Sequence, residues 1–284
     1  MTSQAVRRLR DEVRRDRALV EQAMTSVPLA DGSTIRMARF GSGPAVVCAA
    51  TVPELGFVYA PQIRALSERY QVVLYDPRVS RSARVSLADR ARELTAVADT
   101  LERPSAHILS WSDAGATAYL AASRHPDRFE SVTFMGLPDV YAFPGPVTLL
   151  AQGLYRWPIE RAVPAFALRL LLSHYLSGPR LPRAWLHEEV RRIDALPRYV
   201  RHSVLPLMLE HRPVHGELPM RSLMIMGDRD RLVPLRRMRA MAKALGPRCE
   251  PVLVPGGEHI LGYGAPGPVN EALDRFYTSV GTAR

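Results

Sequence analysis

The residue best suited to covalent chemistry in this 284-residue chain is a serine between a strand-like run and a helical pattern. Ser112 follows the apolar run 106–111 and begins a helical pattern that extends to residue 125. A sharp strand-to-helix turn projects one side chain above a sheet, and it requires small residues two positions before and after the nucleophile. Ser110 and Ala114 meet that requirement. The pattern predicts a nucleophilic serine, which needs a base to accept its proton and an acid to orient that base.

Short apolar runs alternate with helical patterns along most of the chain. Strands are predicted at residues 45–50, 71–76, 106–111, 131–136, 221–227 and 250–254, and helices at residues 59–70, 86–101, 113–125, 234–245 and 269–280. A hairpin is predicted at residues 26–40 around Asp31-Gly32, and a charged helix at residues 5–24. Continuous apolar strands that alternate with helices predict an α/β fold, in which helices cover both faces of a mostly parallel sheet.

Residues 137–216 interrupt this alternation. They hold several helical patterns separated by prolines, and they carry many large apolar side chains. We therefore predict three parts, which are an N-terminal helix at residues 1–24, a core at residues 25–136 and 217–284, and an inserted helical cap at residues 137–216.

From about residue 28 onward the chain resembles the α/β-hydrolase superfamily, with the serine turn in HILSWSDAGATAYLAASRHPDRFESVTFMG at residues 107–136. The resemblance implies the α/β-hydrolase fold, with a helical cap inserted in the core, and a Ser-Asp-His triad. MGDRDRLVP at residues 226–234 resembles the family's acid loop, which gives the acid role to Asp230. PGGEH at residues 255–259 resembles the histidine loop and gives the base role to His259. Asp228 and Asp139 stay open as alternative acids.

The resemblance also implies an oxyanion hole made of two backbone N–H groups. One would come from Asp113, and the other from Val52 in the loop after the strand at residues 45–50. That loop reads Ala50-Thr51-Val52-Pro53 where the family usually has His-Gly, and VSRS at residues 79–82 replaces a common Gly-x-Gly-x-Ser turn. These departures indicate a reshaped site or a member that has drifted from hydrolysis.

WSDAG at residues 111–115, together with Asp76-Pro77-Arg78, is similar to the valacyclovir hydrolase group of amino-acid ester hydrolases. In that group the aspartate after the serine recognises the α-ammonium group of the substrate, a role that the resemblance gives to Asp113. A carboxylate beside the nucleophile would attract a cation, whereas a helix-capping role for Asp113 is the alternative. Trp111 and Thr51 are the other predicted substrate-binding residues. The apolar cap favours an apolar acyl or leaving group.

The net charge of +10 comes almost entirely from arginine, since Lys243 is the only lysine. The basic excess is spread along the chain instead of lying on one element, so we expect no nucleic-acid partner. No apolar run is long enough for a membrane helix, and we expect no membrane partner. The N-terminus, with Arg7-Arg8, lacks the apolar core of a secretory signal, and Cys48 and Cys249 are the only cysteines. We expect a cytoplasmic protein whose N-terminal helix packs on the body or on a second subunit, so a homodimer stays open.

These residues predict a serine hydrolase that cleaves an ester, thioester or amide of a small, largely apolar substrate. The reaction would pass through an acyl-enzyme on Ser112 and would need no metal and no organic cofactor. The same triad could serve an acyltransferase, a lactone- or thioester-processing enzyme or a C–C bond hydrolase, and the sequence does not separate these chemistries. A catalytically weak ligand-binding protein on the same fold is the alternative of another class.

Overall fold

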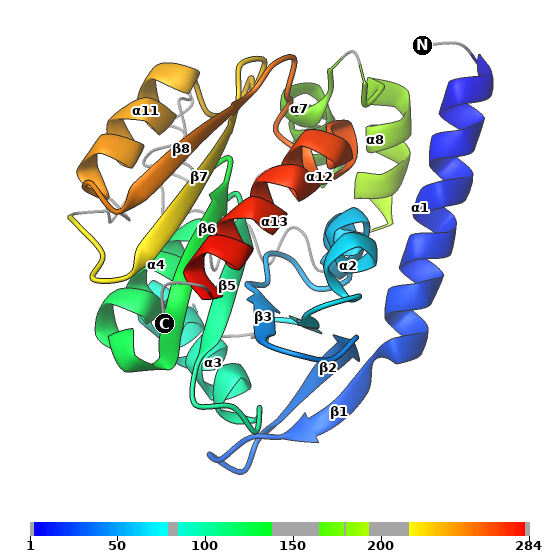
Figure 1. The fold of residues 1–284 in the computed structure, drawn as a ribbon. Coiled ribbons are helices and arrows are strands. Elements are labelled where there is room, and N and C mark those ends of the chain that lie inside the picture. Colours follow the sequence, from blue (N-terminus) through cyan, green and yellow to red (C-terminus); the bar gives the residue numbers. More distant parts are fainter. Residues whose placement is uncertain (1–2, 79–84, 138–164, 179, 193–215, 282–284) are drawn as a thin grey trace.

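The computed structural model describes residues 3–78, 85–137, 165–178, 180–192 and 216–281, with a sheet at the centre and helices on both of its faces (Figure 1). The sheet has eight strands in the order β1-β2-β4-β3-β5-β6-β7-β8. The pairs β1–β2 and β2–β4 are antiparallel, and the other pairs are parallel. The predicted α/β fold with a mostly parallel, doubly covered sheet is confirmed.

The strands coincide closely with the apolar runs of the sequence. They are β1 (Thr25–Pro28), β2 (Thr34–Phe40), β3 (Ala45–Cys48), β4 (Gln71–Tyr75), β5 (Ala106–Trp111), β6 (Phe129–Met135), β7 (Arg221–Gly227) and β8 (Cys249–Val254). Both β3 and β5 are buried along their whole lengths, as expected of central parallel strands with helices on each side. The predicted hairpin forms from β1 and β2, and Gly32 in its turn has a φ of +79° that favours glycine.

Two groups of helices cover the two faces, and each face has its own apolar core. One core is formed by α3 (Leu87–Asp99), α4 (Ala114–Arg124) and α11 (Leu235–Ala244). The other is formed by η1 (Gly56–Tyr59), α2 (Ala60–Leu66), α12 (Leu261–Gly264) and α13 (Pro266–Gly281), with α1 (Ser3–Ala23) along its edge (Figure 1). A further short 3₁₀ helix, η2 (Pro126–Arg128), leads into β6. The period of two along each strand divides the strand residues between the cores, so Val47 joins the first core and Val46 the second.

The predicted cap at residues 137–216 lies largely outside the described residues. Within it the structure describes α7 (Ala165–Leu176) and α8 (Arg183–Arg191), which pack on each other. The division into core and cap stays a prediction. None of the helices in the described part of the chain is long and apolar enough to span a membrane.

Candidate active site

The turn between β5 and α4 holds Ser112 in a strained backbone conformation. Its φ is +55°, a left-handed value that residues other than glycine rarely adopt, and its N–H donates to the carbonyl oxygen of Met135 at 2.9 Å. Ser110 is fully buried and donates its hydroxyl to the carbonyl oxygen of Thr133 at 2.7 Å. A Cβ on Gly115 would come within 2.5 Å of Leu137 Cδ1. The turn is therefore closely packed, and Gly115 is a further position that must stay small.

A chain of hydrogen bonds runs from Ser112 through His259 to Asp230. The Oγ of Ser112 lies 2.9 Å from His259 Nε2, and His259 Nδ1 lies 2.8 Å from Asp230 Oδ2. The other carboxylate oxygen of Asp230 accepts the backbone N–H groups of Leu232 and Val233, each at 2.8 Å. The side chains of His259 and Asp230 have no exposed surface. The structure thus brings together the three residues predicted to form a triad, in a water-poor setting that strengthens each hydrogen bond.

Two loops carry the acid and the histidine, and backbone contacts join these loops. Asp230 follows β7 and His259 follows β8. A Cβ on Gly227 would lie 2.3 Å from the carbonyl oxygen of Gly257, so the loops touch through glycine backbone. Asp228 is exposed and accepts the backbone N–H of Gly256 at 2.6 Å. Asp228, the alternative acid, therefore holds the two loops together and does not contact the imidazole, while Asp139 lies outside the described residues.

Gly136 is a site residue that the sequence analysis did not identify. It directly follows β6 with a φ of +60°, and a Cβ on it would lie 3.4 Å from Asp230 Oδ2 and 3.5 Å from His259 Nδ1. Only its position as a glycine at the end of the predicted strand 131–136 could have drawn attention to it. The two distances from the Cβ are ordinary van der Waals distances, so it is the left-handed φ beside the imidazole and the carboxylate that favours glycine here.

The loop after β3 contains Thr51 and Val52, which are both buried. The hydroxyl of Tyr59 donates to the carbonyl oxygen of Ala49 at the start of this loop, at 2.9 Å. Burial raises the pKa of Tyr59 well above its ordinary value, so this hydroxyl stays a donor. Among the described residues, no hydrogen bond joins Thr51 or Val52 to Ser112. Their predicted roles in oxyanion and substrate binding stay predictions.

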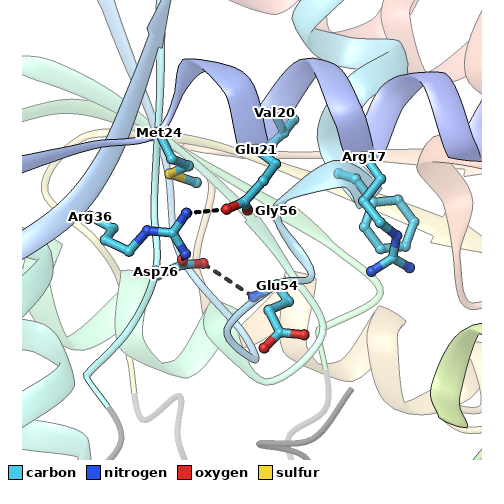
Figure 2. A pocket seen from close by; sticks show the side chains of 9 residues that line it. Arg17, Val20, Glu21, Met24, Arg36, Glu54, Gly56 and Asp76 are labelled. Atoms are coloured by element: carbon cyan, nitrogen blue, oxygen red, sulfur yellow. Dashed lines mark hydrogen bonds and ion pairs between the residues drawn. The ribbon is translucent and has the colours of Figure 1, made fainter. Parts of the chain in front are cut away.

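The far end of this loop is fixed by a charged network that lines a pocket of about 310 Å³ (Figure 2). Glu54 has a φ of +68°, and its N–H donates to Asp76 Oδ1 at 3.2 Å. Asp76 Oδ2 lies 3.0 Å from the guanidinium of Arg36, which also pairs with Glu21 at 2.5 Å. Burial raises the pKa of Asp76, although the N–H of Glu54 and the charge of Arg36 oppose that rise. The network holds a strained residue two positions after Val52.

An apolar cleft of about 60 Å³ lies beside the serine turn. Trp111, next to Ser112, and Ile260, next to His259, line it together with Trp185 and other residues of α8. The indole N–H of Trp111 donates to the carbonyl oxygen of His259 at 2.8 Å. Trp111 therefore lines the cleft and supports the histidine loop, and its role in substrate binding stays a prediction.

Asp113 directly precedes α4 and is buried, with 7% of its surface exposed. Its side chain makes no capping hydrogen bond to the first turn of the helix. The capping alternative that the sequence left open is therefore not observed.

Comparisons with known proteins find hydrolases that are similar in sequence and in fold. No family model matches the chain. A pimeloyl-[acyl-carrier protein] methyl ester esterase of Xanthomonas axonopodis pv. citri is 29% identical over 84% of this chain and 97% of its own length. A Caulobacter segnis protein, named as a proposed carbamate hydrolase RutD, is 28% identical over 77% of this chain and 85% of its own length. A solved structure of a thermophilic esterase from Thermogutta terrifontis matches with a TM-score of 0.73 and 17% identity, covering 90% of this chain and 98% of the esterase chain.

Proposed function

We propose that this chain, which has the fold of the α/β-hydrolases, is a serine hydrolase acting on an ester, thioester or amide of a small, largely apolar substrate. A carboxylic ester is the substrate that the esterase relatives support best. The observation that carries the proposal is the buried hydrogen-bond chain from Ser112 Oγ through His259 to Asp230. Its order along the chain, Ser then Asp then His, is that of the superfamily.

In the acylation step, Ser112 Oγ attacks the carbonyl carbon while His259 Nε2 accepts the hydroxyl proton. Asp230 accepts a hydrogen bond from Nδ1–H of His259, which fixes the tautomer and stabilises the imidazolium. The N–H groups of Asp113 and Val52 would donate to the developing oxyanion. The tetrahedral intermediate then expels the leaving group, which takes the proton from His259, and Ser112 remains acylated.

In the deacylation step, water replaces the leaving group. His259 accepts a proton from that water as its oxygen attacks the acyl carbonyl, and a second tetrahedral intermediate forms. The intermediate collapses, His259 returns the proton to Ser112 Oγ, and the carboxylic acid leaves. The apolar cleft beside Trp111 supports an uncharged acyl chain, since it offers an apolar surface to the substrate.

Intact mass after exposure to a fluorophosphonate tests the proposal directly. We expect one adduct on the wild type and none on Ser112→Ala. A panel of p-nitrophenyl esters then tests turnover. A folded wild-type protein that forms no adduct and cleaves no ester of the panel would contradict the proposal and favour a ligand-binding protein on the same fold.

We further propose that Asp113 recognises a substrate ammonium group next to the scissile carbonyl. Its buried position directly after Ser112 supports this role, because a buried carboxylate beside the nucleophile attracts a cation. The ratio of kcat/KM for an α-amino-acid ester to that for the ester lacking the amine should fall on Asp113→Asn. An unchanged ratio would remove this part of the proposal.

The cellular location and the oligomeric state also belong to the proposal. Both cysteines are free thiols, which supports a cytoplasmic location. The charged outer face of α1 is open to a second subunit, and light scattering of the purified chain would test the homodimer.

A further inference from the structure

The N-terminal helix contacts α8, which lines the apolar cleft beside the serine turn. Arg17 Nη2 of α1 lies 2.6 Å from Glu189 Oε2 of α8. The same guanidinium stacks on Phe57, with its central carbon 4.3 Å from the ring centroid. Figure 2 shows Arg17 at the opposite side of the pocket from Arg36. Arg17 therefore joins α1 to η1 and to α8.

Glu189 is the one charged residue among the described residues that line the cleft. Its side chain is only 8% exposed, yet the surface that the cleft offers is apolar. The carboxylate is paired with Arg17, which accounts both for the low exposure of Glu189 and for the apolar surface of the cleft. Arg192, on the same helix as Glu189, also approaches it at 3.4 Å, but that arginine side chain is 45% exposed, so solvent screens the second pair more strongly.

A carboxylate facing an apolar cleft would change what the cleft accepts. An unpaired negative charge in a water-poor pocket attracts a cationic chain and disfavours an uncharged one, because both its desolvation and its Coulomb energy are large there. With Arg17 bound to it, Glu189 presents only its apolar stem to the cleft. The substrate preference of the cleft thus depends on a residue of another helix that does not itself line it.

We propose that Arg17 of the N-terminal helix determines specificity, because it neutralises Glu189 and keeps the cleft selective for uncharged acyl chains. This inference rests on the proposed hydrolase function. It assigns to α1 a role in substrate choice. Arg17 would influence which groups are accepted at the far end of the acyl chain, whereas Asp113 would recognise a group next to the carbonyl.

Matched p-nitrophenyl esters test this role. Butanoate and β-alaninate differ by a terminal methyl group against a terminal ammonium group, and heptanoate and ε-aminocaproate repeat the comparison with a longer chain. The measured quantity is the kcat/KM of the ammonium ester divided by that of the methyl ester. Arg17→Met should raise this ratio at least about tenfold in one or both pairs. Arg17→Lys keeps the charge and should stay close to the wild type.

A matched control distinguishes the effect of a charge in the cleft from the effect of a weakened contact between α1 and α8. Arg10 of α1 pairs with Glu188 of α8 at 3.0 Å, but both side chains are more than 40% exposed and Glu188 does not line the cleft. Arg10→Met should leave the ratio unchanged. Adding Glu189→Leu to Arg17→Met should return the ratio to the wild-type value. An unchanged ratio in Arg17→Met for both ester pairs, or an equal change in Arg10→Met, would overturn the proposal.

Urea denaturation of the same variants tests the ion pair between Arg17 and Glu189 independently of catalysis. Arg17→Met should lower the unfolding midpoint more than Arg10→Met, since it leaves a nearly buried carboxylate with only its weaker partner. Glu189→Leu should recover the midpoint in the Arg17→Met background. Equal shifts for the two arginine variants would overturn the proposal. A wild type that cleaves no ester and takes no fluorophosphonate is a different result, which contradicts the hydrolase function itself.

Discussion

Asp230 and Asp228 stand two residues apart after β7, yet they serve different partners. Asp230 lies 2.8 Å from the imidazole of His259, whereas Asp228 accepts a backbone N–H from Gly256. Asp230→Asn should lower kcat by roughly 10³- to 10⁴-fold, because an amide neither fixes the imidazole tautomer nor stabilises the imidazolium. Asp228→Asn keeps an acceptor for Gly256 and should stay within about threefold of the wild type. Steady-state kinetics on one p-nitrophenyl ester compares them, and a large loss in Asp228→Asn would reassign the acid.

Gly136 contributes to the site through its left-handed backbone conformation beside the triad. Gly136→Ala should lose about 1 to 2 kcal/mol of stability from its positive φ, and it should also lower kcat because relief of that backbone strain would displace His259 and Asp230, which the new Cβ contacts. Gly32 is the matched control, since its φ is also positive and a Cβ there would meet nothing within 4 Å. Gly32→Ala should lose a similar free energy of unfolding without a change in kcat. Urea denaturation and ester turnover measure the two effects, and equal kcat values for both variants would contradict this account.

At the scale of single residues, the sequence predicted those site residues that a local sequence pattern marks. Ser112, Asp230 and His259 each follow an apolar run, and the structure brings their side chains together. The contact between Arg17 and Glu189 joins positions 172 residues apart, and no local pattern marks either residue. Contacts between distant segments depend on the folded geometry, so sequence reasoning did not find this pair.

The loop after β3 is the element that departs most from the family pattern, and Asp76 holds its far end. Asp76→Ala removes the acceptor for the N–H of Glu54, so the strained φ of Glu54 should relax and shift Val52. If Val52 donates to the oxyanion, kcat should fall by about tenfold while KM changes little. Arg36→Met is the control, since it removes the ion pair but leaves the acceptor in place. Equal kcat values for Asp76→Ala and the wild type would remove the support that we assign to Asp76.

Short helices escaped the sequence analysis, for a physical reason. The elements η1 and α12 have four residues each, which is close to a single turn, so they show no helical period. Long amphipathic helices such as α13 were predicted within a few residues of their observed ends. The short elements form because the chain must pass closely over α2 and beside the histidine loop, which is a tertiary requirement.

At the scale of the whole molecule, the fold class followed from the alternation of strands and helices, but the strand order did not. β3 lies between β4 and β5. After β3, the chain therefore forms β4 on one side of β3 and then crosses over to form β5 on the other side. Short apolar strands are similar in sequence, so the sequence alone does not show which strands are neighbours. The packing of the helices in the crossover connections determines the strand order. The result places β3 at the centre of the sheet, with an apolar core on each of its faces.

The two cysteines allow the stability of the sheet to be measured at a central strand and at an edge strand. Cys48 ends β3 and is 1% exposed, and burial raises the pKa of its thiol. Cys249 begins the edge strand β8, is partly exposed, and has a pKa raised by its own partial burial. A thiolate forms only after a thiol meets water, so Cys48 should react only when the central sheet opens.

In Cys249→Ser, labelling of Cys48 by a thiol reagent should be slow in buffer and accelerate with urea. The opening free energy should equal that of global unfolding, about 5 to 15 kcal/mol for a domain of ordinary stability. In Cys48→Ala, labelling of Cys249 should be faster and nearly independent of urea at low concentration, because fraying of an edge strand exposes little surface. The urea slope from circular dichroism gives the reference for global unfolding. A Cys48 slope well below that reference would mean that β3 opens locally, which would contradict a single cooperative sheet with two cores built on its faces.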